Sequence, residues 1–284
     1  MSTAGFIGLG NIGAPIARRL LANDDGLIVY DVVPEACDAL VADGAQRAES
    51  LKDVAVGAEV ICVMVQNDAQ VRDVVSGLLP DIRPGAIIAI HSTIDASTAI
   101  EVAEIAIEHD VAVLDAAVSG GFMGAAEGTL ALLVGGDEDA MERARPVLSH
   151  YASLIVHFGP VGSGVKAKIA RNLITFVSYA AVAEAQHLGA AAGLDLVKLG
   201  QVVRHSDAVT GGPGAIMHRD VVGPLDPSDG WFGPISGAIN LGEKDLALAT
   251  QLASELGVDV PMTTTALERL ADTFGVPHSE YFTP

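Results

Sequence analysis

The chain has 284 residues, half of them hydrophobic, and this length is sufficient for two domains. Its formal net charge is −20, from 36 acidic residues against 16 lysines and arginines. A charge of this sign repels phosphate backbones and anionic lipid surfaces, so we expect neither a nucleic acid nor a membrane as a partner.

The two cysteines, Cys37 and Cys62, have no paired spacing, which is typical of a reducing compartment and provides neither a disulfide nor a thiolate metal site. The N-terminus shows no signal-peptide pattern. The most apolar run, residues 173–183, is far shorter than the roughly 20 residues of a membrane span. The sequence therefore predicts a cytoplasmic protein.

Short β-branched runs alternate with helical patterns between residues 4 and 157. Such apolar strands between helices are typical of a parallel sheet that is covered on both faces. The expected strands have the sequences GFIGLG, LIVYD, EVICVMV, AIIAIHST, VAVLDAA, LALLVGG and SLIVHFG.

The pattern changes to long helical segments after the glycine-rich turn FGPVGSG. We therefore predict an α/β domain over residues 1–161 and an all-helical domain over residues 162–284. The first helix of the second domain is long and joins the two domains. Because its middle is apolar, we expect it to be buried between domains or subunits, as in a homodimer or homotetramer. The expected helices cover residues 164–192, 195–205, 235–257 and 261–274.

Glycines at positions 8, 10 and 13 form a GxGxxG pattern in GLGNIG. An apolar strand precedes this turn and a helix follows it, so the context indicates a dinucleotide-binding Rossmann domain. The glycines permit a tight turn and close approach to a pyrophosphate, which meets the free amides of the helix N-terminus. The residues expected to bind the cofactor here are Gly8, Gly10, Asn11, Ile12 and Gly13.

Asp31 ends the second expected strand. In a Rossmann domain this carboxylate accepts hydrogen bonds from the adenosine ribose and repels a 2′-phosphate. Val32 and Val33 follow it and provide no arginine for that phosphate. The sequence thus favours NAD over NADP, although an aspartate after a strand also commonly caps a turn.

Two further segments contain candidate polar groups. The segment DAAVSGG ends in Ser119, Gly120 and Gly121, whose amides and hydroxyl can receive a carboxylate. Local evidence alone favours an ordinary strand-to-helix turn there. The segment KDLALA places Lys244 beside Asp245, for which a surface ion pair is the simpler interpretation.

The long helix begins with two lysines, Lys166 and Lys168, which helix geometry separates. At about 100° per residue, Asn172, Thr175 and Tyr179 fall within roughly 40° of Lys168, whereas Lys166 lies on the far side. A partly desolvated lysine has a lowered pKa and can exchange a proton with an alcohol. Lys168 is therefore the candidate general acid and base, with a solvated surface lysine as the alternative.

The combination of these segments resembles the β-hydroxyacid dehydrogenase family, which contains 3-hydroxyisobutyrate dehydrogenase. The resemblance covers essentially the whole chain. It is based on four segments in the family's order: GFIGLGNIGAPIA, DAAVSGG, GPVGSGVKAKIARN and KDLALA.

The resemblance implies a role for each matching residue. Lys168 corresponds to the catalytic lysine and Asn172 to a substrate-binding asparagine. The loop of Ser119, Gly120 and Gly121 corresponds to the carboxylate-binding loop. The residues implied to contact the cofactor outside the glycine turn are Val65, Asn67, Thr93 and Lys244.

The chain departs from the family's pattern at Ala117, Gln66 and His91, where proline, proline and aspartate are common. These departures leave the substrate open, as does the segment 210–234, in which Trp231 and Phe232 are candidate pocket walls. The histidines show no metal-binding spacing, so we expect no metal site.

We therefore expect an NAD-dependent oxidoreductase that interconverts a small β-hydroxy carboxylate and its semialdehyde or keto acid. One alternative is an NADPH-linked aldehyde or imine reductase of the same fold. The other is a nucleotide-binding protein without catalytic activity.

Overall fold

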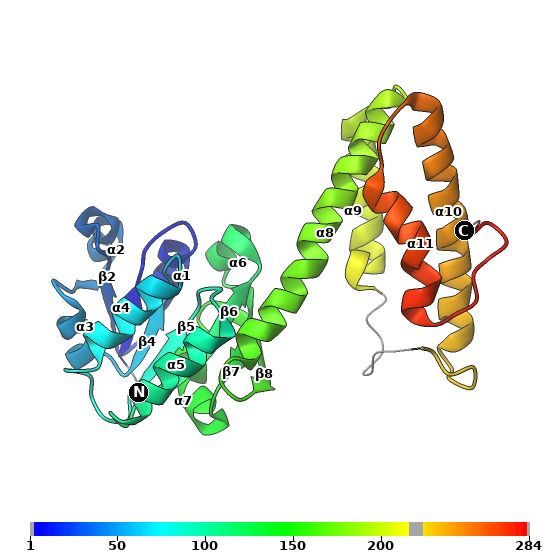
Figure 1. Ribbon diagram of the computed structural model, residues 1–284. Helices are drawn as coiled ribbons and strands as arrows, with labels where there is room; N and C mark the ends of the chain where they lie inside the picture. Colours follow the sequence, from blue (N-terminus) through cyan, green and yellow to red (C-terminus); the bar gives the residue numbers. More distant parts are fainter. Residues whose placement is uncertain (1–2, 216–223, 283–284) are drawn as a thin grey trace. The chain divides into compact units, whose positions relative to one another are not determined.

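The computed structural model describes residues 3–215 and 224–282 (Figure 1). Its contacts divide the chain into two units, Met1–Arg171 and Asn172–Pro284. The first unit contains an eight-stranded sheet with helices, and the described part of the second contains helices and their connections. This confirms the predicted fold class. No helix within the described residues is long and apolar enough to cross a membrane.

The strand order in the sheet is β3-β2-β1-β4-β5-β6-β7-β8. All neighbouring pairs are parallel except β6 and β7, which are antiparallel. The strands are β1 (Ala4–Ile7), β2 (Leu27–Tyr30), β3 (Gln46–Arg47), β4 (Val60–Val63), β5 (Ile87–Ile90), β6 (Ala112–Ser119), β7 (Leu130–Gly135) and β8 (Ala152–Gly159).

Helices cover both faces of this sheet (Figure 1). Successive strand residues point to opposite faces, so Phe6 packs in one apolar cluster and Ile7 in the other. The cluster of Phe6 includes residues of α1 (Gly13–Leu20), α2 (Asp38–Ala42), α6 (Gly121–Glu127) and α7 (Glu138–Leu148). The cluster of Ile7 includes residues of α3 (Leu51–Gly57), α4 (Asp68–Leu78) and α5 (Ala96–Ile107).

The direction of β7 differs from the wholly parallel sheet that the sequence pattern predicts. A parallel crossover needs roughly a dozen residues or more, whereas only the segment 120–129 connects β6 to β7. This segment contains the short helix α6, and the chain reverses there. The two-residue strand β3 is absent from the expected strands, because so short an edge strand leaves no apolar pattern in the sequence.

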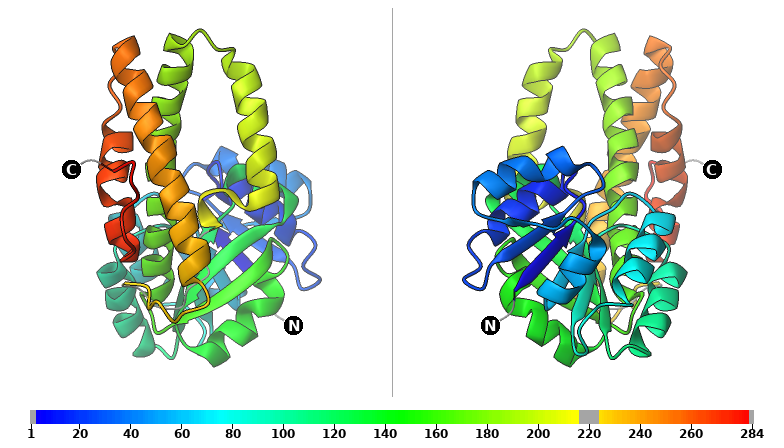
Figure 2. Two further views of the ribbon diagram at one scale, coloured as in Figure 1. Left: turned by 90° about the vertical axis from the view of Figure 1, so that its right-hand side faces the viewer. Right: turned by 90° about the vertical axis from the view of Figure 1, so that its left-hand side faces the viewer.

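The second unit contains the continuation of α8 (Ser163–Ala191), which begins in the first unit. The other elements are α9 (Leu196–Thr210), the 3₁₀ turn η2 (Gly212–Gly214), α10 (Phe232–Leu256) and α11 (Pro261–Phe274). Helices α10 and α11 lie side by side in both views of Figure 2 and share a small apolar cluster. Glu184 of α8 accepts hydrogen bonds from the amides of Met262 and Thr263 at the start of α11.

A chain of buried polar groups ties β4, β5 and β6 together. His91 directly follows β5, and its Nδ1 lies 2.7 Å from the carbonyl oxygen of Ala116 in β6. Its Nε2 lies 2.9 Å from the hydroxyl of Tyr151, which lies 3.4 Å from Sγ of Cys62 in β4. Burial lowers the pKa of His91 to about 4, so the ring is neutral near pH 7.

The direction of each hydrogen bond in this buried network follows from the Ala116 carbonyl at its end. A carbonyl only accepts, so the neutral ring of His91 carries its hydrogen on Nδ1. Nε2 therefore accepts from Tyr151, whose oxygen accepts from the Cys62 thiol. Burial raises the pKa of Cys62 to about 12, which keeps the thiol protonated. His91 is thus a satisfied core histidine that holds β6 in place.

Candidate active site

The glycine turn between β1 and α1 has room only for glycine at two positions. Gly8 has a φ of +92°, and a Cβ there would lie 2.2 Å from the carbonyl oxygen of Met64. A Cβ at Gly13 would lie 1.9 Å from the carbonyl oxygen of Gly8. Helix α1 has no side-chain cap and no acidic residue in its first turn. Its first amides and its positive dipole end are therefore suited to a pyrophosphate.

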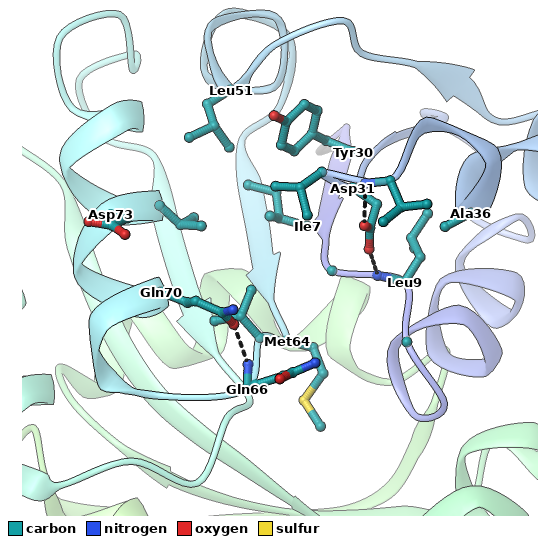
Figure 3. Close-up of a pocket in the computed structure, with 16 residues that line it drawn as sticks. Ile7, Leu9, Tyr30, Asp31, Ala36, Leu51, Met64, Gln66, Gln70 and Asp73 are labelled. Carbon is teal, nitrogen blue, oxygen red and sulfur yellow. Dashed lines mark hydrogen bonds between the residues drawn. The ribbon is translucent and has the colours of Figure 1, made fainter.

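Asp31 is fixed by two backbone amides at the end of β2. Its Oδ2 accepts from the amide of Leu9 at 2.6 Å, and its Oδ1 accepts from the amide of Val33 at 2.9 Å (Figure 3). These two bonds orient the carboxylate and leave each oxygen a further lone pair for a ribose hydroxyl. The side chain therefore both closes the turn and offers a binding group, so the two interpretations of Asp31 are compatible.

A cavity of about 550 Å³ adjoins Asp31 and the glycine turn. Its lining comes from the ends of β1, β2 and β4 and from helix α4, as Figure 3 shows. Among the lining residues, only Asp31 and Asp73 are charged, and both are acidic. The lining residues that the sequence analysis did not single out include Ile7, Leu9, Tyr30, Ala36, Leu51, Met64, Gln70, Asp73 and Val74.

The cofactor residues implied by the family resemblance lie in different places. Val65 lines the cavity, and its amide donates to Oγ of Ser92 at 2.9 Å. Asn67 caps α4 by accepting from the amide of Gln70 at 3.0 Å and is not part of the lining. Thr93 is exposed beyond β5 and is also outside the lining.

A second cavity, of about 580 Å³, lies between the glycine turn and α6. Gly10 and Asn11 line one part of it, and Phe122 of α6 lines another. The loop 119–121 immediately precedes Phe122, so the cavity extends from the glycine turn toward this loop. Phe122 is more than half exposed, so its aromatic ring is accessible at the wall of this cavity.

The predicted carboxylate-binding loop joins β6 to α6. Ser119 is buried at the end of β6, whereas Gly120 and Gly121 are exposed. Gly120 has a φ of +129° and Gly121 a φ of +62°, which are backbone conformations that favour glycine. Since a Cβ at Gly121 would meet no atom within 4 Å, the backbone at this position is open to a ligand.

Lys168 and Lys166 have opposite environments on α8. Lys168 is only 8% exposed, whereas Lys166 is exposed. Burial lowers the pKa of Lys168, and the nearby charge of Arg171 lowers it further. Helix geometry favours the same lysine. A lysine with reduced proton affinity is suited to proton exchange, which most surface lysines are not.

Asn172 and Lys244 belong to the second unit. Asn172 is half-buried on α8, and Lys244 on α10 forms an ion pair with Asp245 at 3.1 Å. Trp231 precedes α10 and is 44% exposed. No group of three or more potential metal-binding side chains occurs among the residues described, which do not include His218.

Two family profiles together cover nearly the whole chain. The NAD binding domain of 6-phosphogluconate dehydrogenase matches residues 3–159. The profile described as "NAD-binding of NADP-dependent 3-hydroxyisobutyrate dehydrogenase" matches residues 162–275.

Individual proteins show the same relationship. The NAD-dependent L-serine dehydrogenase of Pseudomonas aeruginosa is 38% identical over 278 residues, which cover 94% of this chain and 90% of that protein. The structure of an oxidoreductase from Mycobacterium avium is 48% identical, with a TM-score of 0.95, and covers 98% of this chain and 100% of its own.

A third relative is a 3-hydroxyisobutyrate dehydrogenase of Mycobacterium tuberculosis, solved with L-serine. It is 33% identical, with a TM-score of 0.68, and covers 98% of this chain and 96% of its own. Both the profiles and these relatives extend over the two units. The chain therefore belongs to the β-hydroxyacid dehydrogenase family, which includes 3-hydroxyisobutyrate dehydrogenase.

Proposed function

We propose that the protein is an NAD-dependent dehydrogenase of a small β-hydroxy carboxylate, with Lys168 as its general acid and base. The burial of Lys168, which lowers its pKa, is the observation that carries this proposal. Membership of an NAD(P)-dependent oxidoreductase family supplies the reaction class. Burial of an amine costs hydration free energy and destabilises the fold, so a catalytic role gives a reason for its position.

The proposed cofactor site consists of the glycine turn, the cavity and Asp31. Gly8, Gly10, Asn11, Ile12 and Gly13 hold the pyrophosphate on the first amides of α1. The Asp31 carboxylate accepts from the ribose hydroxyls, and Val65 contacts the dinucleotide from the end of β4. Because the lining of the cavity contains two carboxylates and no cation, it disfavours the 2′-phosphate of NADP.

The proposed chemistry needs one proton acceptor. A bound NAD would supply the hydride acceptor for the hydroxyl-bearing carbon of the substrate. The neutral amine of Lys168 takes the hydroxyl proton as the carbonyl forms, and its ammonium returns the proton in the reverse direction. Ser119, Gly120 and Gly121 hold the substrate carboxylate, and Asn172 orients the hydroxyl. Asn67, Thr93 and Lys244 are further proposed contacts of the cofactor.

The proposed substrate class is a short carboxylic acid with a hydroxyl on the β carbon. L-Serine and 3-hydroxyisobutyrate both have this arrangement, and relatives named for each of them match most of the chain. The exposure of Gly121 and the open space beside its Cα support carboxylate binding at this loop. Hydrogen-bond donors are needed there because an anion that leaves water without hydrogen-bond partners loses hydration free energy.

Cofactor preference and turnover separate this proposal from its alternatives. An NADPH-linked aldehyde or imine reductase would use NADPH better than NADH and would not oxidise hydroxy acids. A nucleotide-binding protein without activity would bind NADH and turn over none of these substrates.

The domain boundary at residue 161 and a cytoplasmic location remain predictions.

We also propose that the protein is a homodimer or homotetramer. None of the 15 residues of α9 is buried, and Val197, Val202 and Val209 are each more than 60% exposed. An isolated helix of this length is marginally stable in water, so it needs a packing partner. A second copy of the chain is the simplest partner, as exposed apolar side chains of this kind commonly mark interfaces.

Light scattering coupled to size-exclusion chromatography tests the oligomer. We expect a mass of at least twice that of one chain at micromolar concentration. A mass equal to one chain would contradict the proposed assembly, although it would leave the catalytic proposal intact.

The two lysines of α8 provide a matched test of the catalytic proposal. Lys168→Ala should lower the rate of NAD reduction about 10²- to 10⁴-fold, the usual loss when a general base is removed. Lys166→Ala should have little effect, because this side chain is exposed. NADH binding, measured by fluorescence titration, should be retained in both variants, since neither lysine lines the cofactor cavity.

The assay follows NADH absorbance with L-serine, 3-hydroxyisobutyrate, 3-hydroxypropionate, glycerate and threonate as substrates. Equal losses from the two variants would show that the buried lysine has no special role. No turnover of any of these acids by the native protein would contradict the proposed function itself.

Asp31→Asn tests the proposed basis of cofactor choice. Loss of a charged hydrogen-bond acceptor should raise the KM for NAD about 10-fold or more and reduce the preference for NAD over NADP. Asp73→Asn is the control, because it removes the other carboxylate of the cavity without touching the amides of Leu9 and Val33. An unchanged ratio of kcat/KM for NAD and NADP in Asp31→Asn would exclude Asp31 as the discriminating group.

A further inference from the structure

Asp115 of β6 is a buried carboxylate whose partners lie far away in the sequence. Its side chain is fully buried within the sheet. Oδ1 accepts from the amide of Gly162 at 2.8 Å, and Oδ2 accepts from the amide of Val165 at 2.8 Å. Both amides belong to the first turn of α8 and the residue before it. A side chain of the sheet therefore caps the helix that bears Lys168.

The backbone of α8 also meets the sheet without intervening side chains. A Cβ at Gly164 would lie 2.2 Å from the carbonyl oxygen of Asp115 and 2.4 Å from that of Leu133. A Cβ at Gly135 would lie 2.4 Å from Oδ1 of Asp115 and 2.8 Å from the amide of Gly164. The backbones therefore pack so closely at these glycines that the first turn of α8 has little freedom to shift against β6 and β7.

The hydrogen bonds to Asp115 favour its ionised form. Each carboxylate oxygen accepts from an amide, which is the arrangement that favours the charged form. Burial raises the pKa of Asp115, and the amides of Val165 and Gly162 oppose this effect. Helix α8 has no acidic residue in its own first turn, so Asp115 supplies the side-chain acceptors at this helix end, and its ionised form interacts favourably with the helix dipole.

We propose that Asp115 is a positioning residue for Lys168, acting through the first turn of α8. Lys168 lies one helical turn beyond Val165, so a shift of the capped amides moves the lysine by a comparable distance. This inference rests on the proposed function of Lys168. It extends that proposal by assigning Asp115, which precedes the loop of Ser119, to the placement of the proton acceptor rather than to substrate binding.

Asp137 provides a matched control in the same unit. It caps α7 by accepting from the amide of Ala140 at 2.8 Å, as Asp115 caps α8. Helix α7 carries no residue of the proposed site. If Asp115 acts only on stability, removing either cap should have the same kind of effect. If Asp115 positions Lys168, only its removal should impair catalysis.

Asp115→Asn and Asp137→Asn are compared at temperatures equally far below their respective Tm values. Asparagine keeps the shape of the side chain but presents an amide group to one backbone N–H. We expect Asp115→Asn to lower kcat for L-serine or 3-hydroxyisobutyrate about 10- to 100-fold, as a displacement near 1 Å can do. NADH affinity should be retained, and hydrogen exchange of residues 161–168 should become faster. Asp137→Asn should lower Tm and leave kcat unchanged.

An unchanged kcat in Asp115→Asn would overturn the proposal, as would an equal loss of kcat in Asp137→Asn. Asp115→Glu is the second variant if Asp115→Asn does not fold. It keeps the charge and lengthens the side chain by one methylene, and a kcat equal to that of the native protein would also overturn the proposal. Hydrogen exchange needs no substrate, so it reports on the capping of α8 even if the native protein oxidises none of these acids.

Discussion

The attachment of α8 to the sheet is the constraint on which the arrangement of the first unit depends. Asp115 caps the helix, while Gly135 and Gly164 let its backbone approach the strands closely. The turn before the helix thus becomes part of the sheet's packing rather than a loose linker. For the same reason, the unit defined by contacts extends to Arg171 and includes the first turns of α8. Lys168 is therefore held by the framework that also holds the proposed cofactor cavity.

That framework brings the residues of the proposed site in the first unit to one edge of the sheet. The glycine turn, Asp31, Val65 and Ser119 each follow or end a strand, and the carboxyl ends of parallel strands share an edge. The buried chain from Cys62 through Tyr151 and His91 to Ala116 fixes β6 from within. Acidic residues dominate the surface charge, so a buried amine with lowered proton affinity is chemically distinct in this protein.

Features with local signatures could be predicted from the sequence. The glycine turn, the acid after β2 and the four long helices depend on residues close together in the chain, and the fold class was predicted correctly from them. Helix periodicity was sufficient to distinguish Lys168 from Lys166. The roles of the individual site residues remain predictions, including those of Asn172 and Lys244, because their evidence is the family resemblance.

Features that depend on distant contacts could not be predicted. Strand periodicity does not encode direction, so the antiparallel pairing of β6 and β7 was missed. The cap on α8 joins Asp115 to amides 47 and 50 positions away, and no local sequence pattern predicts such a pairing. The side chains of α4 that line the cavity, such as Gln70 and Val74, have ordinary helical spacing and become recognisable only once the strand ends are in place.

The pH dependence of kcat/KM for hydroxy acid oxidation tests the central claim most directly. Oxidation needs the neutral amine, so the rate should rise with pH through the pKa of Lys168 and level off above it. Because burial lowers the pKa of Lys168, the rise should lie below the pH range of an ordinary lysine and should be absent from the residual activity of Lys168→Ala. A rise centred at the ordinary lysine pKa, or one that persists in that variant, would contradict the account.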